Sequence, residues 1–265
     1  MTIHVLIACS KTKSNSASKD LIWNSKTNLE TWSKAWSKQS ELVPANELYN
    51  GRAFKQQLAI CQQQKKVRTY ILSAGAGLIS NINTNLPSYE ATFQVNHGPS
   101  LKDWHSLPLG GLENLKLNSN DVVVSFAPPQ YHRALSNDLH IEKIYSQLIV
   151  PSTSPLANKA GTTIPIHPRA KEFFGVADAD LNTAFLKIYF TEGIEGFNSI
   201  IAACDTLPPL VERRKVTDEE LLELVIQSKH CESLESLVRH LRDCLKVAAS
   251  TERISAARKL SSKKL

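Results

Sequence analysis

Four short apolar runs, separated by polar turns and helical segments, dominate the first two thirds of the chain. They lie at His4–Ala8, Val67–Leu72, Asp121–Phe126 and Ile144–Val150. Each run is continuously apolar, which is typical of strands covered on both faces of a sheet. Helical patterns such as Gly51–Lys65 lie between them. We therefore expect an α/β fold, with a four-stranded, mainly parallel sheet in an α/β/α sandwich.

The pattern changes at Pro208-Pro209, which follows a helical stretch from Ala179 to Cys204 and predicts a linker. Beyond it, Thr217 and Glu220 have the spacing of a capping box. Two further short helical patterns follow, at Ser233–Arg239 and Thr251–Leu260. We expect two domains, residues 1–207 and 208–265, the second resembling a helix-turn-helix module. A plain helical bundle packed on the first domain is the alternative.

Positive charge is concentrated at the C-terminal end. The formal net charge is +6, and Arg239–Leu265 holds eight basic residues against two acidic ones. A clustered positive field attracts polyanions, so we expect this end of the chain to bind DNA. A solubilising tail is the alternative. The side chains predicted to contact DNA are Arg239, Arg242, Arg253, Arg258 and Lys259.

The cysteines, histidines and apolar runs exclude several classes of protein. The five cysteines are widely spaced without a Cys-x-x-Cys pair, which favours a reducing, cytoplasmic compartment over a disulfide framework. The eight histidines have no metal-ligand spacing, so we predict neither a metal nor another cofactor. Nothing predicts a membrane span or a cleaved signal. Protein partners are left open.

Polar turns follow the four predicted strands. Parallel sheets bind ligands beyond the carboxyl ends of their strands, so we expect these turns to share one site. Cys9–Lys13 combines hydroxyls, amines and backbone amides, which suit an anion. Ser73–Gly77 lets the backbone approach a flat ligand, unless its small residues only serve packing. The predicted substrate-binding residues are Cys9, Ser10, Thr12, Lys13, Tyr49, Ser73, Ala74, Gly75, Tyr89, Pro128, Tyr131, Ser154, Leu156 and Asn158.

These motifs carry a resemblance to known families. The Cys-Ser-Lys-Thr-Lys turn at residues 9–13 resembles the catalytic domain of archaeosine synthases, which is related in fold to uracil-DNA glycosylases. Ser154-Pro155-Leu156 looks like the Ser-Pro-Leu of the glycosylase leucine loop. The combination with Leu48-Tyr49, Leu72-Ser73-Ala74 and Tyr89-Glu90 also resembles a family of small bacterial proteins and, more distantly, the peroxide-stress proteins. The resemblance spans residues 3–175 through short motifs and implies a uracil-DNA-glycosylase-like fold.

Two departures prevent a transfer of the uracil-type mechanism. The first loop has no carboxylate, and Ser152 stands where those glycosylases have a histidine. A related resemblance is to phage-defence glycosylases that remove modified cytosines. It implies a DNA glycosylase that releases a modified base, such as glucosylated hydroxymethyl-cytosine, from foreign double-stranded DNA. A tRNA base-modifying enzyme of the archaeosine-synthase type and a non-catalytic DNA-binding stress protein are the alternatives.

The chemistry of base release suggests which residues would act. Positive charge builds on the sugar, so a carboxylate beside it stabilises the transition state. Glu90 is the preferred carboxylate, with Asp20 and Glu47 next. Lys11 is the second predicted catalytic residue; it or Lys13 would hold phosphate or attack C1′ of the sugar.

Aromatic residues suggest how a nucleic acid would be held. A flipped-out base needs an aromatic platform and an apolar plug, for which Tyr49, Tyr89, Tyr131 and Leu156 are candidates. The tryptophans and lysines of residues 23–38 alternate in a way that suits single strands. Trp32 and Trp36 are four residues apart, however, which favours packing of one helix face.

Overall fold

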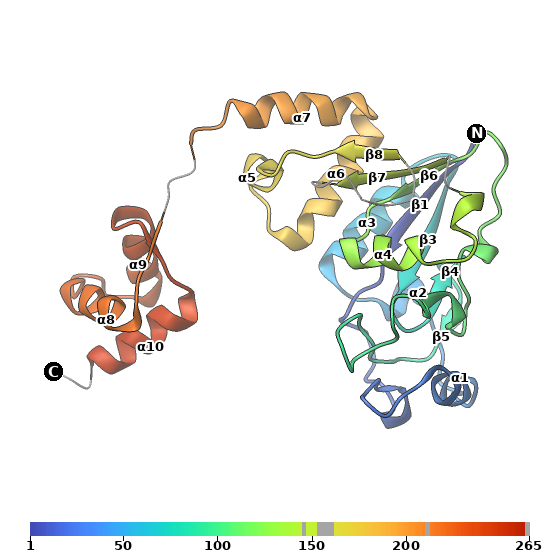
Figure 1. The fold of residues 1–265 in the computed structure, drawn as a ribbon, viewed down its shortest axis with the longest axis horizontal. Helices are drawn as coiled ribbons and strands as arrows, with labels where there is room; N and C mark the ends of the chain where they lie inside the picture. Colours follow the sequence, from blue (N-terminus) through green and yellow to red (C-terminus); the bar gives the residue numbers. More distant parts are fainter. Residues whose placement is uncertain (145–146, 153–161, 210–212, 263–265) are drawn as a thin grey trace. The chain divides into compact units, whose positions relative to one another are not determined.

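The computed structural model describes residues 1–144, 147–152, 162–209 and 213–262. The chain divides into two compact units, Met1–Leu207 and Pro208–Leu265, which are coloured blue to orange and orange to red in Figure 1. Each unit has a hydrophobic core of its own.

The first unit contains a six-stranded sheet in the order β4-β3-β1-β6-β7-β8. All neighbouring strands are parallel except the pair β3 and β4. The expected α/β class and mainly parallel sheet are confirmed. The strands are β1 (Ile3–Ala8), β3 (Val67–Ser73), β4 (Gly77–Ile79), β6 (Val122–Ser125), β7 (Leu148–Ser152) and β8 (Thr162–Pro165).

The expectation of four strands was wrong, because both edge strands lack an apolar run of strand length. β4 has three residues and turns back antiparallel on β3, and β8 reads Thr-Thr-Ile-Pro. The fourth predicted strand also begins later than expected. Ile144 closes a 3-10 turn, and the Gln147 side chain donates to the carbonyls of Asn118 and Asp121 at 2.7 and 2.8 Å.

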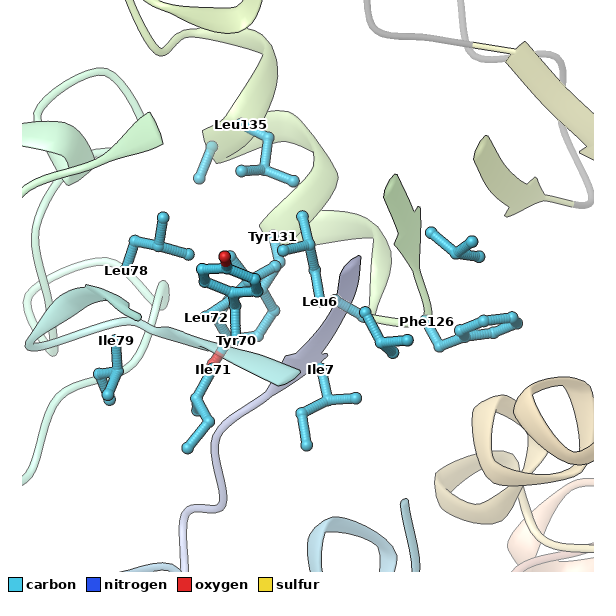
Figure 2. Close-up of a cluster of buried hydrophobic side chains, with 14 of the residues drawn as sticks. Leu6, Ile7, Tyr70, Ile71, Leu72, Leu78, Ile79, Phe126, Tyr131 and Leu135 are labelled. Atoms are coloured by element: carbon cyan, nitrogen blue, oxygen red, sulfur yellow. The ribbon is translucent and has the colours of Figure 1, made fainter. Parts of the chain in front are cut away.

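Helices cover both faces of this sheet. Figure 2 shows Leu6 and Leu78 directed toward Leu135 of α4, whereas Ile7 and Ile79 point to the opposite face. On that face α3 contacts β1 and β3, and α6 packs against α3. The helices of the unit are α1 (Leu29–Ser37), α2 (Ala45–Leu48), α3 (Arg52–Gln62), α4 (Pro129–Ser136), α5 (Ala170–Phe174), α6 (Asp178–Glu192) and α7 (Glu195–Asp205).

Two local features complete the first unit. The helical stretch expected from Ala179 to Cys204 is interrupted at Gly193, whose φ of 66° belongs to the left-handed region that ends a helix. A short antiparallel pair, β2 (Val43–Pro44) with β5 (Asn85–Leu86), holds the connection before α2 against the loop that follows β4.

In its described residues, 208–209 and 213–262, the second unit contains three helices and a short parallel strand pair. The helices are α8 (Asp218–Gln227), α9 (Leu234–Arg239) and α10 (Thr251–Ser261), and a π-helical turn, His240–Cys244, continues α9. β9 (Arg214–Lys215) pairs with β10 (Val247–Ala248). The capping box of Thr217 and Glu220 is confirmed at the start of α8. Among the residues described, no helix is both long and apolar enough to cross a membrane.

Candidate functional site

Parallel pairing brings the predicted loops to one end of the sheet. β3 and β6 both run parallel to β1, so the segments after Ala8, Ser73 and Ser125 leave the sheet at the same end. The expectation of a common end is confirmed for these three loops. The predicted residues of the fourth loop, Ser154, Leu156 and Asn158, lie outside the described residues.

A buried hydroxyl network joins the end of β3 to two other loops, those that contain Tyr49 and Tyr89. Tyr49 and Tyr89 have no exposed surface, and their hydroxyl oxygens are 2.5 Å apart. The Tyr89 hydroxyl also bonds to the Ser73 hydroxyl, which accepts the backbone N–H of Ala76 at 3.0 Å. Burial raises the pKa of both tyrosines, so both remain protonated near neutral pH. These rings lie beneath the surface and offer no face on which a base could stack.

The turn after β3 is occupied by aromatic side chains of the protein itself. The indole N–H groups of Trp104 and Trp32 donate to the carbonyls of Ser73 and Gly75, both at 2.7 Å. A Cβ at Gly75 would lie 2.6 Å from the Tyr89 ring. The absence of a side chain at Gly75 therefore makes room for the Tyr89 ring. This agrees with the alternative that the small residues of this turn serve packing.

Lys13 lies over the hydroxyl network. Its ammonium nitrogen is 4.4 Å from the centre of the Tyr89 ring, within the range of a cation–π contact. Its backbone forms an antiparallel bridge with Tyr49. Burial lowers the pKa of Lys13, against the opposite influence of Cys9 and Glu90. A larger fraction of this amine is therefore uncharged near neutral pH than for an exposed lysine. Lys11 and Thr12 are exposed.

Glu90 presents an exposed carboxylate on a fixed backbone. Its N–H donates to the Leu21 carbonyl at 2.8 Å, and its own carbonyl accepts from Trp23 at 2.9 Å. Residues 20–23 thus run alongside residue 90 in a parallel bridge at Ile22. Because this bridge joins segments far apart in the chain, nothing in the local sequence signals it.

Lys11, Lys13 and Glu90 line one cavity of about 260 Å³. This volume is at or below the small end of the range for small-molecule sites. From the sequence, Trp23 was a candidate for contact with single-stranded nucleic acid. The other lining residues could not be recognised, because they belong to segments that carry no motif. The remaining lining residues are Ile22, Trp23, Ala91, Thr92, Gln94 and His97.

A different cavity, of about 350 Å³, holds other predicted residues. It is lined by Cys9, Ser10 and Pro128, together with Arg52 and Asp180. Tyr131, which is nearly buried, approaches the Cys9 sulfur with its hydroxyl at 3.4 Å. The residues predicted to form one shared site are therefore divided: some line different cavities, and others belong to the buried network.

The other two candidate carboxylates lie apart from the cavity that holds Lys13, and the tryptophans are packed in the interior. Glu47 and Asp20 are exposed and do not line it. Trp32 is fully buried and Trp23 nearly so, and Trp36 packs 5.2 Å from Tyr89 between ring centres. The packing interpretation of Trp32 and Trp36 is confirmed.

Basic side chains of the second unit are largely engaged within it. Arg253 pairs with Asp218, Arg258 donates to the Glu232 carbonyl, and Arg242 donates to the Ala249 carbonyl. Arg239 pairs with Glu235 at 3.2 Å, one turn earlier in α9, and Lys259 is exposed. Over residues 208–265, twelve lysines and arginines face nine acidic residues. Internal pairing therefore uses much of the charge that was expected to face DNA.

Comparison with protein families gives a match to part of the chain. Residues 33–152 match the model of a family of unknown function, DUF6884. The matched range includes Tyr49, the turn after β3, Glu90 and Tyr131, but neither lysine of the first loop and no part of the second unit. No curated protein and no solved structure matches the chain.

Proposed function

We propose that this protein is a nucleic-acid N-glycosidase that releases a modified base at the cavity between Lys13 and Glu90. The observation that carries the proposal is that a half-buried amine with a lowered pKa and an exposed carboxylate line the same small cavity. Perturbed titratable groups in a cavity are candidates for catalysis. The cavity volume suits a single extruded base better than a large cofactor.

The two side chains suit the two charges of the reaction. As the bond from C1′ to the base breaks, the leaving base takes the electron pair and the sugar becomes cationic. The Glu90 carboxylate stabilises that cation. The Lys13 lone pair forms a bond to C1′, the amine proton passes to Glu90 or water, and ring opening gives an imine. Water then hydrolyses the imine, which restores the amine and leaves an abasic sugar.

Positive charge next to the cavity supports a polyanionic substrate. Residues 11–38 contain six lysines and two acidic residues. Lys19, Lys26, Lys34 and Lys38 line a hollow of about 420 Å³, which shares Ile22 with the cavity of Lys13 and Glu90. Phosphates held along these lysines would continue from a nucleotide in the cavity.

The fold family, the identity of the base and the DNA-binding role of the second unit are part of the same proposal. The parallel sheet with loops at one end supports a uracil-DNA-glycosylase-like fold, and the phage-defence resemblance supports a modified cytosine as the base. In the second unit, three short helices are compatible with a helix-turn-helix, in which α10 would face DNA. Of the five side chains expected to contact DNA, Lys259 of α10 is exposed, and Arg239 of α9 is exposed although it pairs with Glu235.

The test is incubation of the full chain with duplex and single-stranded DNA carrying unmodified or glucosylated hydroxymethyl-cytosine. We expect mass spectrometry to detect a released modified base and an equal amount of abasic sites. Glu90→Gln should lower the rate about a hundredfold or more, since a neutral amide cannot stabilise the cation. Lys13→Ala should remove the protein–DNA adduct that borohydride traps.

Two variants of exposed residues that line neither cavity serve as controls. Glu41→Gln and Lys65→Ala make the same chemical changes and should leave the rate unchanged. No base release from any of these DNAs would contradict the proposal. Release that persists at a normal rate in both Glu90→Gln and Lys13→Ala would place the chemistry elsewhere.

A further inference from the structure

The second unit brings together three side chains that are common metal ligands. His230, Cys231 and His240 each offer one ligand atom, and these atoms all lie within 4.8 Å of one another. The two imidazole rings are 4.7 Å apart between centres and nearly perpendicular. Cys231 and His240 are half-buried and His230 is exposed, so an ion could enter from solvent.

The spacing of the three atoms is close to what zinc requires. Tetrahedral Zn²⁺ with bonds of about 2.0–2.3 Å places its ligand atoms about 3.3–3.6 Å apart. The separations of up to 4.8 Å need a contraction of about 1.5 Å at most. Rotation of side chains achieves a change of this size without movement of the helices. Thiolate with imidazole is a ligand set that suits zinc, whereas calcium and magnesium prefer oxygen.

The backbone holds the three residues in place from two directions. The N–H of Cys231 donates to the Ser228 carbonyl at 3.0 Å, in the turn that ends α8. The Arg258 guanidinium of α10 donates to the carbonyl of Glu232, the residue after Cys231. His240 is the first residue of the π-helical turn, and its carbonyl accepts from Leu245 at 3.1 Å. Such turns are frequently found at functional sites.

We propose that His230, Cys231 and His240 bind one zinc ion, with the fourth position open to water or another ligand. The site lies within the second unit and does not depend on the glycosidase proposal. Binding requires neutral imidazoles and a thiolate, so it releases protons and weakens as the pH falls. The ion would join the end of α8 to the start of the π-helical turn.

The experiment is a titration of the metal-free full chain with Co²⁺, which takes the place of zinc and is visible by absorption. We expect one Co²⁺ per chain, a thiolate-to-cobalt charge-transfer band and displacement of the cobalt by Zn²⁺. Cys231→Ser should abolish the band and weaken zinc binding about tenfold or more, since even partners outside the ligand shell cost 10- to 100-fold. Cys244→Ser is the matched control, because this exposed thiol of the same unit lies outside the cluster and should leave the band intact.

Three outcomes would overturn the proposal. They are a wild-type titration without the band, a band that Cys231→Ser retains, and equal loss of the band in both cysteine variants. If Cys231→Ser does not fold, His230→Gln tests the same site, since His230 is exposed and its replacement leaves the core of the unit intact. We expect His230→Gln to weaken zinc binding by a similar factor while retaining the charge-transfer band.

Discussion

At the scale of single residues, burial decides what the polar groups of this protein can do. Tyr49 and Tyr89 look like surfaces for a base in the sequence, yet their hydroxyls satisfy one another and Ser73 in the interior. A buried tyrosine hydroxyl needs such a partner, and the partners here come from three separate loops. The same burial lowers the pKa of Lys13, which is what makes its amine a candidate nucleophile.

A second buried polar pair gives a prediction about pH. His132 of α4 is buried with its Nε2 atom 2.9 Å from the Ser125 hydroxyl, and burial lowers its pKa to about 4. In the unfolded chain His132 takes up a proton near pH 6.5, whereas in the folded chain it stays neutral at that pH. Stability contributed by this group is therefore present above pH 6.5 and is lost as the pH falls toward 4.

We expect the wild-type chain to lose about 2–3 kcal/mol more than His132→Gln between pH 7 and pH 4.5. Urea unfolding followed by tryptophan fluorescence measures the difference. His97→Gln, at an exposed histidine, controls for the general effect of losing an imidazole and should behave like the wild type. An equal pH dependence of the free energy of unfolding in wild type and His132→Gln would show that His132 does not cause the loss of stability at low pH.

At the scale of elements, the segment that contains α1 has two distinct sides. Trp32 lies against the turn after β3, whereas Lys34 and Lys38 of the same segment are exposed. Aromatic and basic residues that alternate in sequence are therefore separated in space. This arrangement favours contact with phosphates over stacking on bases.

We expect replacement of Lys26, Lys34 and Lys38 by alanine to weaken nucleic-acid binding and to flatten its salt dependence. If each lysine contacts one phosphate, the slope of log K against log salt falls by about 2–3. Fluorescence anisotropy with labelled DNA at several salt concentrations measures this slope. A matched triple replacement of the exposed lysines Lys65, Lys102 and Lys116 should leave it nearly unchanged. Equal slopes in both triple variants would mean that this face of the protein binds no phosphate.

How far the elements could be predicted depended on the kind of interaction that forms them. β1, β3 and β6 were predictable because burial on both faces demands continuous apolar runs. The edge strands β4 and β8 were not, since three residues or a Thr-Thr-Ile-Pro run carry no strand pattern. In the candidate site, Lys13 and Glu90 were recognised from their loops. The bridge between Ile22 and Glu90 depends on contacts across 68 positions and leaves no local signal.

At the scale of the whole molecule, the two units have separate cores. The core of residues 1–207 is built around the sheet. The core of the second unit contains Leu221, Val225, Leu241, Val247 and Ile254. Truncation at Arg239 would remove Leu241, Val247 and Ile254 and expose the rest of this core. The contribution of the second unit is therefore better tested by ending the chain at its boundary.

We expect a chain that ends at Leu207 to fold and to keep the cavity of Lys13 and Glu90. All four tryptophans lie in the first unit, so their fluorescence reports on that unit alone. The urea midpoint of this fluorescence should be nearly the same in the truncated and full chains. Far-UV circular dichroism of the full chain should show additional helix loss, from the three helices of residues 208–265. The reason for this expectation is that separate cores normally allow separate folding. A truncated chain with exposed tryptophans and no cooperative transition would show instead that the first unit depends on the second for its fold.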